Sequence, residues 1–475
     1  MSSGSRRILA NTGYRLLADA GSKVVSFGFY VVMARELGAE GFGAFTFGLS
    51  FVLVVTTLGN FGQDSILTRE VARDRTLLDR YFVNTLALKV VLCGLSLTVA
   101  IGVASAAGVS AQTRAVLLLL GPASVLELLT MTCFAVFQSF ERLEFTPIAL
   151  ISQRTLIAVV GIAVLLAGAG VVLVSAVYLA GTLFGFLFAL FLLRTRLARP
   201  SLHITPAWWW PLMKAAAAIG LAGVFSVVLF RIDMTMLAAF KGAKVVGHYG
   251  AAYRLLEATL FISWSVSAAV YPVFSRLSPV SEPPVGFVYE RGIKLGVALT
   301  LPLATGAAIL ARPVVELLYG PEYSDAVWAL RLLAPAIAFY PLCFITASLL
   351  VSQNRQRVLL VVYALVAAEN IVLNLVLIPW LSLYGAALGT SVSTILVAVA
   401  FVASAHRGLD YPRVFGGPVV ASAAAGSAML LLREDFAAAL VAGVAVYAAV
   451  LFVFERRLFP DDARAVLDLL PGRTA

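Results

Sequence analysis

The sequence contains few charged residues, and this scarcity excludes most soluble proteins. Charged residues make up 13% of the 475-residue chain and hydrophobic residues 61%, whereas soluble domains average about 25% and 45–50%. A soluble protein of this composition could not cover its surface with polar groups, and a disordered chain needs the opposite balance. The mean hydropathy of +0.96 therefore indicates a protein whose main solvent is lipid.

Cysteine and histidine are also scarce, with three of each in the whole chain. Each cysteine lies inside an apolar run, which predicts buried free thiols rather than a disulfide scaffold. The histidines are too far apart in sequence for metal-ligand spacing, so we expect no metal site. These residues are Cys93, Cys133, Cys343, His203, His248 and His406.

Basic residues exceed acidic ones by 35 to 25, a formal net charge of +10. In a soluble protein this excess would suggest nucleic acid, but cytoplasmic loops of membrane proteins also collect Lys and Arg. We therefore expect no nucleic-acid partner. At the N-terminus, Arg15, Asp19 and Lys23 interrupt the first apolar run and no cleavage site follows. This pattern predicts a retained helix and not a signal peptide.

Fourteen stretches have roughly the 20 apolar residues that a membrane-spanning helix needs. The predicted spans are 9–33, 43–63, 82–107, 114–138, 147–168, 172–194, 211–238, 247–275, 289–311, 326–351, 357–378, 383–404, 415–432 and 436–455. With the N-terminus inside, most Lys and Arg residues fall in cytoplasmic loops, and this bias persists to the C-terminus. The sequence thus predicts an all-α polytopic membrane protein with both termini cytoplasmic, whose short loops leave no room for a soluble catalytic domain.

A short glycine-containing pattern occurs twice, at residues 38–45 and 242–249. Each copy lies in a predicted external loop and enters the next span, and the two copies are six spans apart. Because six is even, both halves have the same orientation, which predicts parallel repeats with a binding site between them. We expect two pseudo-symmetric six-helix lobes at 1–200 and 201–410, followed at 411–475 by two additional helices and a short cytoplasmic tail.

Ionisable residues inside the first spans mark candidate functional positions, because each costs at least ~2.5–3.5 kcal/mol at membrane depth. Arg15, Asp19 and Lys23 are spaced i, i+4, i+8 on one helical face. They form either a self-neutralising ladder near the inner interface or, as we favour, a stripe that lines a cavity. Glu127 and Lys89 stand alone in their spans, and Lys89 is expected to extend toward the inner interface.

The seventh and eighth spans carry two further pairs of charges. Arg254 and Glu257 are at i, i+3 and can pair within their helix. Arg231 and Asp233 are two residues apart and point to different sides, so they need partners on other helices.

The eleventh and twelfth spans carry polar residues of another kind. Asn370 and Asn374 share a helical face, and Glu369 lies about 100° around the helix from Asn370. Thr390 and Thr394 lie on the next span. Asparagine and threonine can simply bond between helices, whereas an intramembrane glutamate favours a functional role.

Three groups of motifs carry a resemblance to a known family. They are 34–43 with Asn60-Phe61-Gly62 and Arg69-Glu70, then Arg231-Ile232-Asp233 leading to 246–249 and 252–254, and finally Leu318-Tyr319-Gly320 with Glu322-Tyr323. The chain resembles the oligosaccharide (O-antigen, Wzx-type) flippases of polysaccharide biosynthesis. These belong to the multidrug/oligosaccharidyl-lipid/polysaccharide exporter superfamily, with lipid II flippases and multidrug exporters as more distant members.

The resemblance implies two lobes that alternate access and move an isoprenoid-pyrophosphate-linked oligosaccharide from the cytoplasmic to the outer leaflet. It implies that basic side chains on helices 1 and 8 bind the substrate, here Arg15, Lys23 and Arg254. We group Asp19, Arg231 and Glu257 with them as candidate substrate-binding residues. It also implies a coupling site for H⁺ or Na⁺, with candidates Asp233, Glu369, Asn370, Asn374 and Thr394, and a lipid-tail groove at the two extra helices.

We expect no cofactor other than a coupling H⁺ or Na⁺, and a monomer in the cell membrane. Its partners would be lipid-linked oligosaccharide, membrane lipids, and glycan polymerase or transferase machinery. A multidrug exporter on the same fold is an alternative, because it would need an acidic cavity for cationic drugs and Asp19, Glu127 and Glu369 leave that open. A membrane glycan polymerase or glycosyltransferase is a further alternative, but the large external loop typical of such enzymes is missing, so we expect no enzyme.

Overall fold

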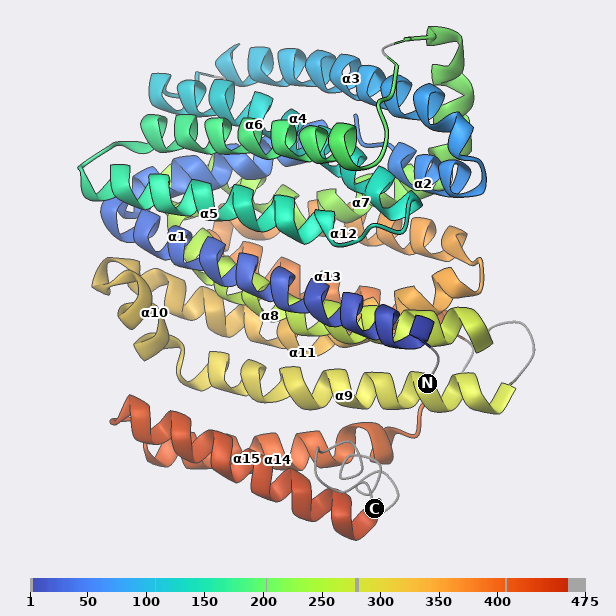
Figure 1. Ribbon diagram of the computed structural model, residues 1–475. Helices are drawn as coiled ribbons and strands as arrows, with labels where there is room; N and C mark the ends of the chain where they lie inside the picture. Colours follow the sequence, from blue (N-terminus) through green and yellow to red (C-terminus); the bar gives the residue numbers. More distant parts are fainter. Residues whose placement is uncertain (1–2, 107, 202, 278–281, 406–407, 460–475) are drawn as a thin grey trace. The chain divides into compact units, whose positions relative to one another are not determined.

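The computed structural model describes residues 3–106, 108–201, 203–277, 282–405 and 408–459, with side chains from Gly21 onward except at 277 and 282–284. Every regular element in this part of the chain is a helix (Figure 1). The chain divides into two compact units. Unit 1 comprises residues 1–251 and 363–386, and unit 2 comprises residues 252–362 and 387–475.

Unit 1 contains helices α1 to α7, and residues of α2 through α6 form a large apolar cluster in its core. Its elements are α1 (Ser3–Thr56), α2 (Gln63–Arg73), η1 (Arg75–Leu77), α3 (Leu78–Ala106), α4 (Ala111–Ser139), α5 (Phe145–Leu166), α6 (Val171–Arg196), η2 (Pro206–Trp208) and α7 (Trp209–Lys241). Helix α4 packs on α6, and α5 packs on both α1 and α6. Buried Phe82, Phe137 and Phe145 join α3, α4 and α5 in one apolar cluster.

Helix α8 (Ala243–Leu277) is divided between the two units, because its residues up to Ala251 belong to unit 1. Unit 2 consists of the rest of α8 and most of the helices that follow it. Its elements are α9 (Glu282–Ile309), α10 (Ala311–Tyr319), η3 (Pro321–Tyr323), α11 (Ser324–Ser352), α14 (Tyr411–Leu431) and α15 (Phe436–Leu458). Helices α12 (Gln356–Leu381) and α13 (Leu383–Ser404) contribute to both units. Helix α9 packs against α11 and α14, and α14 packs against α15.

Helix α1 contains two of the predicted spans. Its 54 residues break at Gly38, whose φ of 63° and ψ of −179° lie outside the helical region. At 1.5 Å per residue a straight helix of this length would extend about 80 Å, far more than the roughly 30 Å of a bilayer core. Figure 1 shows the chain turning back at the break. Thirteen described helical segments are long and apolar enough to cross a membrane, and counting the broken first one as two gives the predicted fourteen.

The distribution of apolar side chains is that of a protein in lipid. Large apolar side chains stay exposed along whole helices, for example Val91, Leu95 and Val99 on α3. Polar side chains such as Gln63, Asn84 and Lys89 are buried instead. The three cysteines are buried and free, as predicted. Two short helices, α2 and α10, lie in segments that we expected to be loops.

The two copies of the glycine pattern share one backbone conformation. Gly38 has φ 63° and ψ −179°, and Gly242 has φ 81° and ψ 176°. Only glycine adopts this conformation readily, so both copies end one helix and redirect the chain in the same way. The predicted boundaries at residues 200 and 410 lie within unit 1 and unit 2, so the compact units are not the predicted lobes. The division into two six-helix lobes stays a prediction.

Candidate functional site

The predicted pair on α8 forms in unit 2. An Arg254 guanidinium nitrogen donates to Glu257 Oε2 at 2.7 Å, and the Arg254 residue is only 8% exposed. The charges of this pair also act on Tyr319, at the end of α10. Burial raises the pKa of Tyr319, so its phenol stays protonated and can only act as a neutral hydrogen-bonding group. The arrangement holds one guanidinium in a fixed position against a carboxylate.

Asp233 on α7 is almost fully buried and has a partner on another helix, as expected. Tyr249 on α8 donates its hydroxyl to Asp233 Oδ2 at 2.5 Å, and the backbone N–H of Met234 donates to Oδ1 at 2.7 Å. The two donors give each carboxylate oxygen of Asp233 a hydrogen-bond partner in the interior of unit 1. Arg231, two residues earlier, is half-buried.

The polar residues of α12 form the predicted asparagine pair. Asn374 Nδ2 donates to Asn370 Oδ1 at 2.9 Å, and both side chains are fully buried. The Asn374 Oδ1 atom has no hydrogen-bond partner among the described residues. Glu369 is half-buried on the same helix. Thr394 belongs to unit 2, where its hydroxyl donates to the carbonyl of Thr390 at 2.8 Å.

The stripe on the first helix is described only in part. The backbone is helical from residue 3 through Gly21 and Lys23, as the i, i+4, i+8 spacing requires. The side chains of Arg15 and Asp19 lie outside the described residues. Lys23 is exposed on the surface of α1.

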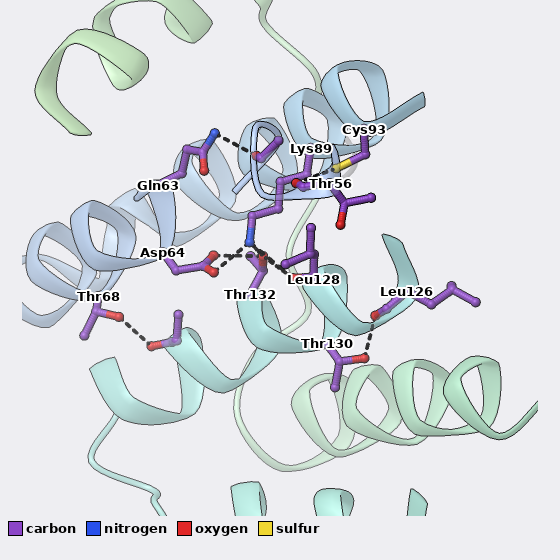
Figure 2. Close-up of polar contacts among 12 residues, drawn as sticks. Thr56, Gln63, Asp64, Thr68, Lys89, Cys93, Leu126, Leu128, Thr130 and Thr132 are labelled. Atoms are coloured by element: carbon purple, nitrogen blue, oxygen red, sulfur yellow. Dashed lines mark hydrogen bonds and ion pairs between the residues drawn. The ribbon is translucent and has the colours of Figure 1, made fainter. Parts of the chain in front are cut away.

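Our expectation for Lys89 was wrong, because this lysine is buried and ion-paired in the core of unit 1. Its ammonium donates to Asp64 Oδ2 at 2.6 Å, Thr132 Oγ1 at 2.9 Å and the Leu128 carbonyl at 3.1 Å. Thr132 also donates to Asp64 Oδ1 at 2.9 Å. Figure 2 shows these side chains converging from α2, α3 and α4. All three ammonium protons therefore have acceptors, so Lys89 does not need to reach the interface.

Glu127 is not alone either. Arg154 lies on α5, inside the predicted span 147–168, and pairs with Glu127 on α4 at 3.2 Å. Tyr178 on α6 donates to Glu127 Oε1 at 2.9 Å and accepts from Arg154 at 3.2 Å. These partners lie on three different helices, so no local spacing in the sequence could have revealed them.

An apolar cavity of about 620 Å³ lies in unit 2 among α11, α13 and the start of α14. Aromatic rings of Phe339, Tyr411 and Phe415 line it, with small and branched residues of α13 between them. Such a surface suits a hydrocarbon chain rather than a polar ligand. The described residues contain no cluster of His, Cys, Asp or Glu that could hold a metal ion.

The sequence model of the family described as "Polysaccharide biosynthesis protein" matches residues 8–278, more than half of the chain. The chain belongs to this family. A second family model, MatE, matches residues 218–376, consistent with one superfamily of transporters.

Two relatives of this polysaccharide biosynthesis family member come from Haloferax volcanii. "Probable low-salt glycan biosynthesis flippase Agl15" is 24% identical over 176 residues, which are 37% of this chain and 37% of that protein. "Probable flippase AglR" is 25% identical over 178 residues, 36% of this chain and 37% of that protein. The chain thus matches little more than a third of the length of these relatives.

Solved structures share the fold of this polysaccharide biosynthesis family member. "Lipid II flippase MurJ, inward closed conformation" has a TM-score of 0.79 at 15% identity, covering 93% of this chain and 98% of that one. An inward-facing multidrug resistance MATE family transporter has a TM-score of 0.63 at 16% identity, covering 81% and 93%. The fold of the chain is that of these polytopic helical transporters.

Proposed function

We propose that this protein is a flippase that moves an isoprenoid-pyrophosphate-linked oligosaccharide from the cytoplasmic to the outer leaflet by alternating access. The observation that carries the proposal is the match of the polysaccharide biosynthesis family over residues 8–278. The names of the Haloferax volcanii relatives support it. The protein would work as a monomer in the cell membrane with both termini cytoplasmic, supplying glycan polymerase or transferase enzymes.

The physical task is to carry a charged, sugar-bearing head group across about 30 Å of hydrocarbon. Basic side chains replace the hydration of the pyrophosphate, and arginine does so best because its planar fork binds two oxygens at once. We assign this role to Arg15, Lys23 and Arg254. Glu257 orients Arg254 and offsets its charge between cargoes, since the pair is already in contact at 2.7 Å. Asp19 and Arg231 complete the assigned substrate-binding group.

Coupling to H⁺ or Na⁺ is assigned to Asp233, Glu369, Asn370, Asn374 and Thr394. Hard cations bind oxygen ligands, and the buried Asn374 Oδ1 is an acceptor without a described hydrogen-bond partner. The Asp233 carboxylate supplies a negative charge that would attract either ion. The apolar cavity among α11, α13 and α14 is assigned to the lipid tail of the cargo, because apolar side chains form most of its lining.

Arg254→Ala tests the proposal in cells that lack the native gene. We expect lipid-linked oligosaccharide to accumulate on the cytoplasmic leaflet and surface glycan to fall by about 10- to 100-fold. This range corresponds to the loss of about 1.5–3 kcal/mol, the strength of a hydrogen bond to a charged group. Arg312→Ala is the matched control, because the Arg312 side chain is 67% exposed and pairs with the partly exposed Glu316 on the same helix, α10.

Equal export by both variants, at the wild-type protein level, would contradict the assignment of Arg254. Normal surface glycan in the deletion strain, with redundancy excluded, would contradict the flippase itself. The MatE match over residues 218–376 supports one alternative function, the export of cationic drugs. That rival predicts that deletion changes drug sensitivity and leaves lipid-linked oligosaccharide at its normal level.

A further inference from the structure

The two copies of the glycine pattern contact each other in a reciprocal way within unit 1. A Cβ atom built on Gly43, in the first copy, would lie 1.8 Å from the carbonyl oxygen of Ala243, in the second. A Cβ atom built on Gly247 would lie 1.9 Å from the carbonyl oxygen of Ala39. In each copy the glycine stands five residues after the redirecting glycine, and the alanine carbonyl one residue after it. The repeats therefore touch backbone to backbone, across a local pseudo-two-fold axis.

The next turn of each helix continues the contact. Thr46 and Gly250 each lie eight residues after their redirecting glycine. A Cβ atom on Gly250 would lie 3.0 Å from Thr46 Cγ2 and 3.4 Å from Thr46 Oγ1. Thr46 is fully buried, and its hydroxyl has no hydrogen-bond partner among the described residues. Equivalent positions of the two repeats thus stay paired over two helical turns. We call these four residues, Gly43, Thr46, Gly247 and Gly250, the glycine closure.

We propose that the glycine closure is a releasable seal on the external side of the membrane, and that it parts once in every transport cycle. The external position rests on the proposed topology, and the transport cycle on the proposed function. Two features suit a seal that opens and closes. Backbone surfaces without side chains separate without any change of rotamer, and they return to contact only if nothing larger than hydrogen occupies the two glycine positions.

A wedge is the first test. Gly43→Ala and Gly247→Ala each place a methyl group 1.8 or 1.9 Å from a carbonyl oxygen, so closure is blocked and export should fall at least tenfold. Gly223→Ala on α7 is the matched control, since nothing lies within 4 Å of its added methyl group. Wild-type export by both wedge variants would overturn the proposal.

The accessibility of an introduced thiol measures whether the seal is open, and this measurement does not depend on the identity of the cargo. The reporter is Thr46→Cys in a background in which Cys93, Cys133 and Cys343 are replaced. A membrane-impermeant maleimide added from outside should label it slowly in the otherwise native protein and at least tenfold faster with Gly247→Ala. Equal labelling rates would overturn the proposal. Faster labelling together with normal lipid-linked oligosaccharide would support the seal and reject the proposed cargo.

A reversible lock covers the case in which the wedge variants fail to fold. The pair Thr46→Cys and Gly250→Cys suits a disulfide, because the 3.0 Å contact keeps the two Cβ atoms no more than about 4.5 Å apart. Oxidation of the two cysteines to a disulfide should lower the export rate at least tenfold, and reduction with dithiothreitol should restore it. If the fully cross-linked protein exports as fast as the protein treated with dithiothreitol, the closure does not need to part during transport, and the proposal is overturned.

Discussion

A lysine buried between membrane helices needs an acceptor for each of its ammonium protons. Lys89 has all three, namely Asp64, Thr132 and the Leu128 carbonyl, and the lysine is 0% exposed. Asp64 stands in the first turn of α2, where the positive end of the helix dipole also favours a carboxylate. The cluster therefore joins α2, α3 and α4 with every charge compensated.

Lys89→Met tests how much this compensation contributes to stability. Removing the ammonium leaves the partly buried Asp64 carboxylate without its counter-charge, so we expect a loss of about 3–5 kcal/mol in the free energy of unfolding. Denaturant unfolding in detergent micelles measures it. Arg312→Met, which breaks an exposed pair, should cost no more than about 1 kcal/mol. Equal losses in the two variants would show that Asp64 is solvated, and Lys89→Met with Asp64→Asn should recover part of the loss.

At the scale of elements, two glycines decide where long helices end and turn. Gly38 and Gly242 combine a positive φ with an extended ψ, a region that side chains other than hydrogen avoid. The sequence pattern around each predicts a turn, and the structure adds that the turns are equivalent in the two repeats. Each redirecting glycine places the following helix in register for the contact made by Gly43 and Gly247.

Gly38→Ala and Gly242→Ala should each cost about 1–3 kcal/mol, because each glycine has a backbone conformation that other residues avoid. Gly242 shows this most clearly, since nothing lies within 4 Å of a Cβ atom placed there. The control is Gly28→Ala in α1, which has similar free space and an ordinary helical backbone. It should gain about 0.5–1 kcal/mol. Thermal unfolding followed by tryptophan fluorescence distinguishes the two directions, and a stabilised Gly242→Ala would contradict the strain argument.

At the scale of the whole molecule, what could be predicted depends on whether the partners are local in sequence. Span positions, the Arg254–Glu257 pair and the Asn370–Asn374 pair follow from composition and helical spacing, and the structure contains them. The Lys89 and Glu127 clusters join residues that are 24 to 68 positions apart, so only tertiary packing reveals them. The helices α2 and α10 were missed because they are too short and too polar to register as spans.

The number of times that α1 crosses the membrane decides whether the two termini of the chain lie on the same side. If the two limbs of α1 are separate spans, fourteen spans place both termini on the same side of the membrane. If α1 crossed once, thirteen spans would place them on opposite sides. We expect fourteen, because the chain turns back at Gly38 and the two limbs together are far too long for one crossing.

Impermeant maleimide labelling of single cysteines, combined with an N-terminal epitope tag, distinguishes these topologies. Lys244→Cys and Arg433→Cys should label from outside intact cells, whereas Arg75→Cys should label only after permeabilisation, together with exposure of the tag. All three positions are exposed in the structure, so a position that is not labelled from outside lies on the other side of the membrane and is not simply buried in the protein. A tag on the opposite side from Arg75 would mean that α1 crosses once. In that case residues 39–56 would lie outside the bilayer with the turn at Gly38, and the glycine closure would no longer be a seal across the membrane.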